Sequence, residues 1–515
     1  MKIFATAAAT SSVISGCESQ SMSKAQNGSG IKHPNILIII ADQLSQKALP
    51  SYGDKYADAP NIESIMKNGV RFSQVYTPCP LCQPARSAFW TSHYPHQTNV
   101  TTNLPTEPQE ILGSQITKVS PMTEPSMTTL GDVFSSSGYI CRHFGKMHDA
   151  GALRGFECDD PAQTLPVERT HPAWPVNLDT TRDRYTAQRC VDFLESEHDK
   201  PFIAVADFNN PHNICGWVGE NQGEHTDVDI DSKLPELPDN FEVEDMETRA
   251  PGIQYLCCTH PRLNQAAHWN KENYRHYLAA YYHYLKVVDD EIGLVLNALK
   301  HGGYDDNTLI VFMADHGDGM SCHRMTTKRL SFYDETTRIP FAFAGPGIKD
   351  KDMLIEKPLV STLDLVPTLC DYAGVAKPQS LEGQSLMHYL NGKGEPVERD
   401  YLISQWHAEW NFTYEPGRML RTDRYKYIKY AEERAEEFYD LEKDPGEKKN
   451  LINDASYKDI IDKHRKMFAS YLKDKEDPFE SMQAVVDPRW RSHKLGYQNH
   501  EGGSIKDFPP PKELQ

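Results

Sequence analysis

The sequence has little cysteine, little basic charge and no long apolar run for its length. Eleven cysteines are scattered over 515 residues, and this odd, thin distribution excludes a disulfide framework. Hydrophobic residues make up 39% and charged residues 25%, proportions that exclude a multi-spanning membrane protein and a disordered chain. Asp and Glu number 73 against 54 Lys and Arg, and the charge of −19 argues against nonspecific binding to nucleic acid. An anionic substrate would therefore need a local basic pocket.

The length points to two domains. A chain of 515 residues exceeds one ordinary hydrophobic core. Near residue 390 the sequence becomes polar and charged, with short alternating runs such as Tyr425–Tyr430. We expect a large domain over residues 32–390 and a smaller α+β subdomain over residues 391–515 that carries an antiparallel sheet.

The N-terminal stretch does not have the character of a folded segment. Lys2 precedes a short, weakly apolar run, and Ile14-Ser-Gly-Cys17 resembles a bacterial lipobox. The pattern predicts a signal peptide over residues 1–16, lipidation of Cys17 and a polar tether over residues 17–31. It implies an exported bacterial lipoprotein, periplasmic or at the cell surface, that touches the membrane only through its lipid anchor. The alternative is an N-terminus that is never processed.

Buried strands alternate with amphipathic helices in the large domain. Three apolar runs predict strands buried on both faces, over Asn35–Ala41, Phe202–Phe208 and Thr308–Ala314. A short helix is expected over Asn61–Gly69, capped by its first residue and ended by its glycine. A long helix is expected over Asn273–His301. The alternation predicts an α/β fold with a mostly parallel sheet sandwiched by helices.

Polar pairs directly follow two of these strands. Asp42 and Gln43 come after the first strand, and Asp315 and His316 come after the third. Because the carboxyl ends of parallel strands meet at one edge of a sheet, we expect these side chains to lie together. Carboxylate and amide oxygens suit Ca²⁺ or Mg²⁺, whereas the His316 nitrogen is a softer ligand. The competing interpretation is that each Asp merely caps the segment that follows it.

The stretch from Cys79 to Pro95 carries the most distinctive pattern. Cys82, Pro84 and Arg86 form the motif C-x-P-[SA]-R. Pro84 fits the first turn of a helix, which would place residue 82 at a helix N-terminus, a site suited to an anion. Cys79 and Cys82 also form a C-x-x-C pair, but no second pair follows at zinc-site spacing. Taken alone, Cys82 is equally well interpreted as a buried thiol that packs like a small hydrophobe.

From Pro34 to Leu451 the sequence resembles the type I sulfatases of the alkaline phosphatase superfamily. C-x-P-[SA]-R is the signature of that family, in which the Cys is oxidised to formylglycine (3-oxoalanine) after translation. The other matching elements follow in family order: Asp42-Gln43, Gly145-Lys146-Met147-His148, Asn210-Pro211-His212, Asp315-His316-Gly317-Asp318, Lys328 with Tyr333-Asp334-Glu335, Arg338-Ile339-Pro340, Asp364-Leu365-Val366-Pro367, and Phe438-Tyr439-Asp440-Leu441.

The resemblance implies an alkaline-phosphatase-like α/β fold and a sulfuric ester hydrolase. It implies that a formylglycine-generating maturing enzyme converts Cys82, and that the protein binds one Ca²⁺ or, less readily, Mg²⁺. The implied metal ligands are Asp42, Gln43, Cys82, Asp315 and His316. The implied catalytic residues are Cys82, Arg86, His148 and His212, and the implied substrate-binding residues are Lys146, Lys328 and His212.

The implied chemistry agrees with these residue types. The oxygens of a sulfate ester repel a nucleophile, so the metal and the cationic side chains would neutralise them. Hydrated formylglycine at residue 82 would attack sulfur and form a covalent sulfated diol. His212 would protonate the leaving alcohol, a task shared with Lys328, and His148 would take a proton from the second hydroxyl to expel sulfate.

Two positions depart from the family pattern. Gln43 stands where Asp is commoner, which keeps one oxygen but removes a charge from the metal site. Thr91-Ser92 replaces the usual T-G after the start of the helix, a change that we expect to be harmless.

The substrate implied for an exported enzyme of this kind is a sulfated polysaccharide or oligosaccharide. Candidates for the walls of sugar subsites are Trp174, Trp217, His407 and Trp410, with His323 as a weaker candidate for the pocket. The Arg/His-rich stretches 182–189 and 260–276 are interpreted as surface charge. Two alternatives stay open: a phosphate or phosphonate ester hydrolase of the same superfamily, and a noncatalytic glycan-binding surface lipoprotein.

Overall fold

The computed structural model describes residues 33–104, 106–107, 109–111, 114–116, 120–159, 181–221, 234–243, 245, 248–250, 253, 269–328, 331–409 and 413–484. The predicted signal peptide and tether, Trp174, Trp410 and residues 260–268 lie outside the described residues. Within the described ranges, none of the helices combines the length and the apolar character that a membrane span requires.

The predicted mostly parallel sheet forms the centre of the fold and has eight strands. Its spatial order is β11-β2-β10-β9-β1-β8-β6-β7. The parallel strands on one side are β9 (Thr308–Met313), β1 (Asn35–Ala41), β8 (Phe202–Phe208), β6 (Ile140–Gly145) and β7 (Glu157–Asp159). The other strands are β10 (Phe341–Ala344), antiparallel to both neighbours, β2 (Gly69–Phe72) and β11 (Met353–Ile355).

The central strand β1 shows why this sheet forms. All seven of its residues are buried, because it lies between two parallel neighbours and under helices on both faces. Ile40 pairs with Asp207 of β8 and with Met313 of β9, so the three strands end at the same edge. The chain segments that follow β1 and β9 therefore leave the sheet side by side.

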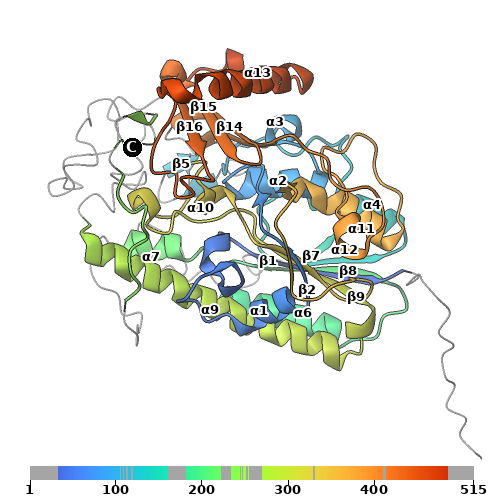
Figure 1. Ribbon diagram of the computed structural model, residues 1–515. Coiled ribbons are helices and arrows are strands. Elements are labelled where there is room, and N and C mark those ends of the chain that lie inside the picture. Colours follow the sequence, from blue (N-terminus) through green and yellow to red (C-terminus); the bar gives the residue numbers. More distant parts are fainter. Residues whose placement is uncertain are drawn as a thin grey trace, which may run out of the picture. The chain divides into compact units, whose positions relative to one another are not determined.

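Helices cover both faces of the sheet, as predicted. In Figure 1 one group lies along the lower side of the sheet: α1 (Pro60–Lys67), α6 (Thr181–Leu194) and α9 (Lys271–His301). A second group lies on the opposite side: α2 (Cys82–Thr91), α4 (Leu130–Ser136), α11 (Leu365–Ala373) and α12 (Met387–Asn391). This arrangement leaves the carboxyl edge of the central strands free to carry a site.

The helix boundaries differ slightly from the predictions. The long helix begins at Lys271 because Asn270 caps it, accepting hydrogen bonds from two backbone amides, and Gly302 follows its last residue. The prediction that Asn61 caps the short helix is wrong. Pro60 is the first helical residue, and Asn61 instead donates to Asp289 on α9. Proline needs no amide partner at that position, so it starts the helix one residue earlier.

The remaining elements are short. They are β3 (Val75–Tyr76) paired with β12 (Val360–Ser361), β4 (Gln109–Ile111) paired with β5 (Ser114–Ile116), α3 (Pro95–Thr98), α7 (Ile214–Asn221) and α10 (Asp334–Thr337). Single turns of 3₁₀-helix occur at Gln46–Ala48, Pro50–Tyr52, Asp305–Asn307, Cys322–Arg324, Thr362–Asp364, Glu432–Arg434, Ala455–Tyr457 and Pro478–Ser481.

The C-terminal part forms the predicted antiparallel sheet with a helix. The strands β13 (Leu402–Glu409), β14 (Thr413–Arg421), β15 (Tyr425–Tyr430) and β16 (Glu436–Asp440) pair in order, and α13 (Lys458–Asp474) follows them. Lys426 of β15 is fully buried, and its ammonium contacts Asp334 of α10 at 2.8 Å and Glu447 at 2.7 Å. This buried ion pair links the antiparallel sheet to α10, which lies earlier in the chain. The predicted domain boundary near residue 390 stays a prediction.

Candidate active site

Helix α2 presents Cys82 at its N-terminus. Leu81 precedes it in an extended conformation, Cys82 is the first helical residue and Pro84 lies in the first turn. All ten residues of the helix are buried, and Ser92 ends it in a left-handed conformation. The motif therefore sets residue 82 and Arg86 at fixed positions, one turn apart, against the edge of the central sheet.

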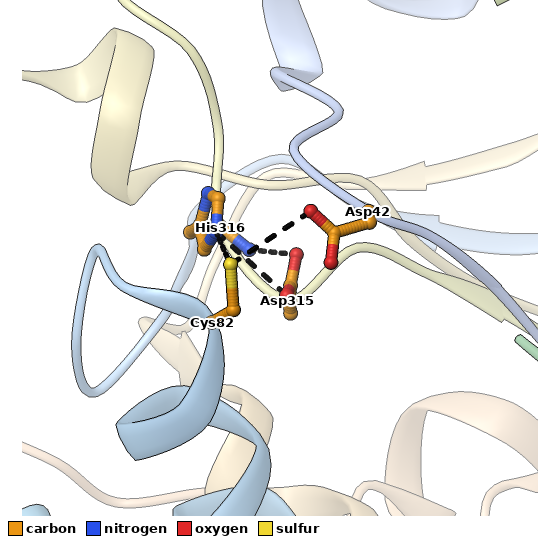
Figure 2. A group of neighbouring side chains, drawn as sticks. All are labelled: Asp42, Cys82, Asp315 and His316. Atoms are coloured by element: carbon orange, nitrogen blue, oxygen red, sulfur yellow. Dashed lines mark hydrogen bonds and ion pairs between the residues drawn. The ribbon is translucent and has the colours of Figure 1, made fainter. Parts of the chain in front are cut away.

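Four side chains that the sequence predicted to meet do meet at this edge. Asp42 follows β1, Asp315 and His316 follow β9, and Cys82 faces them from α2, as Figure 2 shows. Their ligand atoms all lie within 4.8 Å of one another, and all four residues are buried. The Cys82 Sγ lies 3.1 Å from His316 Nε2 and 3.9 Å from Asp42 Oδ1.

Arg86 holds these carboxylates in place. Its Nε, Nη1 and Nη2 groups donate to Asp315 at 3.0 Å, to Asp207 at 2.5 Å and to Asp42 at 2.9 Å, respectively. The guanidinium is completely buried, and although burial opposes the charge, the three carboxylates raise its pKa well above the usual value. The resemblance implies a catalytic role for Arg86, and in the structure all three of its guanidinium nitrogens bind carboxylates.

Two lysines bring further positive charge to the site. Lys146 Nζ donates to Asp42 Oδ2 at 2.6 Å, and Lys328 Nζ donates to Gln43 Oε1 at 2.7 Å. Gln43 Nε2 in turn donates to Asp318 Oδ2 at 2.6 Å, which fixes the amide with its oxygen toward the lysine. Despite burial, the charge of Asp42 raises the pKa of Lys146 above its usual value, so this lysine remains charged.

Two histidines face Cys82 from other elements. His212 follows β8 after the cis peptide bond between Asn210 and Pro211, is half-buried and lies close to Cys82. Burial and the cations of Lys146 and Lys328 lower the pKa of His212 to about 3. His148 is also half-buried and lies close to the same residue. The structure thus places two imidazoles around residue 82.

The electrostatics of the site favour a bound cation. Four buried carboxylates face three cations, namely Asp42, Asp207, Asp315 and Asp318 against Arg86, Lys146 and Lys328. Burial and the nearby Asp42 raise the pKa of Asp315. Burial lowers the pKa of His316, but the charges of Asp315 and Cys82 outweigh it and raise that pKa overall. The excess of buried carboxylates over cations is consistent with an added positive charge between these side chains, and the donor set fits a divalent ion.

Some residues around the site escaped the sequence predictions. Asp207 is the next-to-last residue of β8, its Oδ2 accepts from Arg86, and His143 Nε2 lies 3.2 Å from the same oxygen. Asp149 accepts from Trp90 Nε1 at 2.6 Å. One sequence signal could have identified Asp207, because it is a charged residue inside an otherwise apolar run. A buried charge requires a partner, so its position predicts an ion pair or hydrogen bond.

Other candidates do not reach the site. Trp217 is almost completely buried against Trp269 and Tyr277, and His407 is buried against Arg418, so the prediction that they line sugar subsites is wrong. His323 stacks on Tyr333 with ring centroids 4.1 Å apart, and its Nε2 lies 3.2 Å from the Glu447 carbonyl oxygen. The stretch 182–189 lies on α6, where Arg184 and Arg189 form partly exposed ion pairs, which agrees with its interpretation as surface charge.

Comparison with known proteins gives consistent results. The family model named Sulfatase matches residues 34–375, and the model named N-sulphoglucosamine sulphohydrolase, C-terminal, matches residues 321–474. A Delta 4,5-hexuronate-2-O-sulfatase of Bacteroides thetaiotaomicron is 46% identical over 479 residues, which cover 92% of this chain and 96% of the relative.

Solved structures agree with this relationship. The structure of a 2-O GAG sulfatase is 46% identical to the chain, with a TM-score of 0.84, and the match covers 93% of this chain and 100% of that one. A phosphonate monoester hydrolase of Agrobacterium radiobacter matches at 21% identity and a TM-score of 0.66, covering 88% of this chain and 99% of that one. The second likeness shows only that the fold is shared.

Proposed function

The chain belongs to the sulfatase family and is a sulfuric ester hydrolase, and from this premise we propose that it removes sulfate from glycosaminoglycan fragments by means of a formylglycine at residue 82. The family membership predicted from the sequence is confirmed by the match over residues 34–375. The observation that carries the proposal is the position of Cys82, at the start of α2 and within reach of two carboxylates and three histidines.

The substrate class rests on the 46% identical relative, whose name specifies the 2-O-sulfate of an unsaturated hexuronate. We propose a sulfated hexuronate as the first candidate substrate. Lys146 and Lys328 support an anionic ligand, because both ammonium groups lie within the otherwise acidic protein next to residue 82. They would bind the sulfate oxygens and give the local basic pocket that the overall charge makes necessary.

One divalent cation, for which we propose Ca²⁺, would be held by Asp42, Asp315, His316 and residue 82, with Gln43 as a further oxygen donor. The donor chemistry fits, because two carboxylates and an excess of buried negative charge meet there. Gln43 would have to share its oxygen with Lys328. When bound, the cation supplies positive charge against the sulfate oxygens and lowers the pKa of a neighbouring hydroxyl.

The side chains around residue 82 divide the proton transfers between them. Hydrated formylglycine would supply an oxygen nucleophile in place of the thiol. His212 lies close to residue 82 and to both lysines, and it would give a proton to the leaving alcohol once the negative charge of the bound sulfate offsets the lysine charges that lower its pKa. His148 is placed to take a proton from residue 82 when sulfate leaves. Arg86 keeps Asp42 and Asp315 in position throughout.

We further propose that the protein is an exported lipoprotein anchored through Cys17, and that a maturing enzyme converts Cys82. The first proposal rests on the Ile14-Ser-Gly-Cys17 sequence and the second on the C-x-P-[SA]-R motif. Mass analysis of the N-terminus in the native host should find diacylated Cys17, and an intact Met1 would contradict the anchor.

Release of inorganic sulfate from a panel of defined sulfated oligosaccharides tests the proposed function. The panel should hold 2-O-sulfated unsaturated disaccharides, their 6-O- and N-sulfated counterparts, and phosphonate and phosphate esters as controls. We expect sulfate release from the 2-O-sulfated members. A preparation with converted residue 82 that hydrolyses the phosphonate esters and none of the sulfates would contradict the proposal.

A further inference from the structure

We propose that the unconverted protein, which still has a thiol at residue 82, binds Zn²⁺ through Asp42, Cys82, Asp315 and His316. Conversion of Cys82 then changes the preference of the same site from zinc to a hard, oxygen-seeking cation. The inference rests on the proposed function only in taking Cys82 as the residue that is converted. The binding itself requires no catalytic activity.

The donor set is the first argument. One thiol, one imidazole and two carboxylates converge in a buried position, and Figure 2 shows the sulfur pointing at the imidazole and at the carboxylates. Zinc prefers four ligands drawn from Cys, His and Asp or Glu in tetrahedral geometry. Calcium instead takes roughly six to eight oxygens and no sulfur. A site with a sulfur and a nitrogen among four donors is therefore better suited to zinc.

The spacing of the donor atoms is the second argument. Ligand atoms around a tetrahedral zinc ion lie about 3.4–3.6 Å apart, given Zn–S and Zn–N distances of about 2.3 and 2.0–2.1 Å. The Cys82 Sγ lies 3.1 Å from His316 Nε2 and 3.9 Å from Asp42 Oδ1. His316 Nε2 lies 3.7 Å from Asp315 Oδ2. These three separations bracket the zinc value. Since all four ligand atoms lie within 4.8 Å of one another, the remaining pairs reach tetrahedral spacing through movements of up to about 1 Å.

The surroundings hold the donors in the orientation that a metal needs. His316 Nδ1 lies 2.9 Å from the Gly317 carbonyl oxygen, which accepts a hydrogen only from a protonated Nδ1, so Nε2 is the nitrogen left for a metal. Asp42 directs Oδ2 to Arg86 and Lys146 and leaves Oδ1 toward the sulfur. Such fixed partners behind the ligands are typical of built metal sites.

Conversion removes the feature that selects zinc. Binding to the thiol form breaks the S–H bond, forms a Zn–S bond and releases one proton to water, without oxidation. In the converted protein the sulfur is gone and the hydrate of formylglycine offers oxygen instead, so the soft ligand is lost and the carboxylates dominate.

Cobalt(II) is a suitable probe for this site, because it replaces zinc in tetrahedral sites and absorbs light. Protein made without a maturing enzyme, and shown by peptide mass analysis to hold the thiol, is stripped with chelator and titrated with Co²⁺ and then Zn²⁺. Cys82→Ser is the matched variant, because it puts an oxygen where the sulfur was. Cys215→Ser is the control for a neighbouring thiol, since Cys215 is half-buried and its sulfur lies 3.4 Å from Gln43 Oε1.

We expect the thiol form and Cys215→Ser to show a near-ultraviolet thiolate-to-cobalt band and tetrahedral visible bands, both bleached by Zn²⁺. Cys82→Ser should lack the first band and bind Zn²⁺ more than about 100-fold more weakly than the thiol form. This loss exceeds the roughly 10–100-fold loss of metal affinity that follows removal of a residue that only positions a ligand. Equal zinc affinity of the thiol form and Cys82→Ser would overturn the proposal. A cobalt spectrum without the thiolate band would do so as well, and neither result depends on whether the converted enzyme cleaves sulfate.

Discussion

Arg86 Nε lies 3.0 Å from Asp315 Oδ2, and both residues are completely buried. The same guanidinium binds Asp42 at 2.9 Å, so one cation connects the residues that follow β1 and β9. The sequence separates these two carboxylates by more than half of the chain. Arg86 thus acts on the candidate metal site through the carboxylates that it holds.

Removing the Arg86 charge should destabilise the fold. In Arg86→Met three buried carboxylates lose their common partner, and loss of one member of a buried ion pair costs about 3–5 kcal/mol. Urea unfolding of the variant and wild type measures this difference. Lys458→Met, which removes an exposed pair with Asp462, is the control and should leave the midpoint unchanged. Equal stability of Arg86→Met and wild type would contradict the structural role.

Asp315 should be necessary for metal binding. Asp315→Asn removes a carboxylate from the cluster, and we expect the Ca²⁺ affinity of the converted protein to fall more than about tenfold. Removing a residue that only positions a metal ligand already costs about 10–100-fold in affinity, and Asp315 is itself a proposed ligand. Calorimetric titration of chelator-stripped protein gives the affinity. Asp290→Asn, at an exposed position of α9, is the matched control. Undiminished binding by Asp315→Asn would show that the ion is held elsewhere.

The sequence predicted much of this site because the signals were local. The apolar runs that end in Asp42 and Asp315 fixed the edge of the sheet, and Pro84 fixed the start of α2. The family match confirms the enzyme class, and the eight-stranded sheet confirms the fold class. The roles of the individual site residues stay predictions.

Side-chain partners over long sequence distances could not be predicted. Arg86 reaches Asp207 across more than a hundred residues, and the orientation of the Gln43 amide depends on Asp318 and Lys328. The sequence predicted that Trp217 lines a sugar subsite, but aromatic side chains are equally common in hydrophobic cores. In the structure Trp217 packs against Trp269 in the core. Such choices depend on tertiary packing, which spacing along the chain does not encode.

His212 should matter only when the leaving group needs a proton. We expect His212→Asn to lower kcat for a sulfated disaccharide by about 10²–10⁴-fold, the usual contribution of a general acid. A nitrophenyl sulfate has a leaving group that departs without protonation, so its turnover should fall much less. The two rates are measured on one preparation. An equal loss for both substrates would assign His212 a role other than proton donation.

The Glu447 carboxyl should make stability depend on pH. Burial and the charges of Asp334 and Glu335 raise its pKa from the usual value of 4.5 to about 8, because three carboxylates there share the ammonium groups of Lys47 and Lys426. The folded state therefore keeps a proton that the unfolded state loses, so this contribution to stability declines as pH rises from about 4.5 to about 8.

Glu447→Gln tests this dependence, because the amide resembles the protonated carboxyl and does not titrate. The difference in urea midpoint between the variant and wild type should shift in favour of the variant between pH of about 5 and about 8. A constant difference over this range would show that Glu447 does not titrate there.

The central claim is that turnover depends on conversion of Cys82. A thiol adduct of sulfate would have no internal route to release, whereas a hydrated aldehyde has a second hydroxyl next to His148. The most direct test is peptide mass spectrometry across residues 72–86, paired with the turnover rate of the same preparations at several degrees of conversion. We predict a rate proportional to the converted fraction, and folded but inactive protein when that fraction is zero. Full multiple turnover by protein with entirely unmodified Cys82 would contradict the claim.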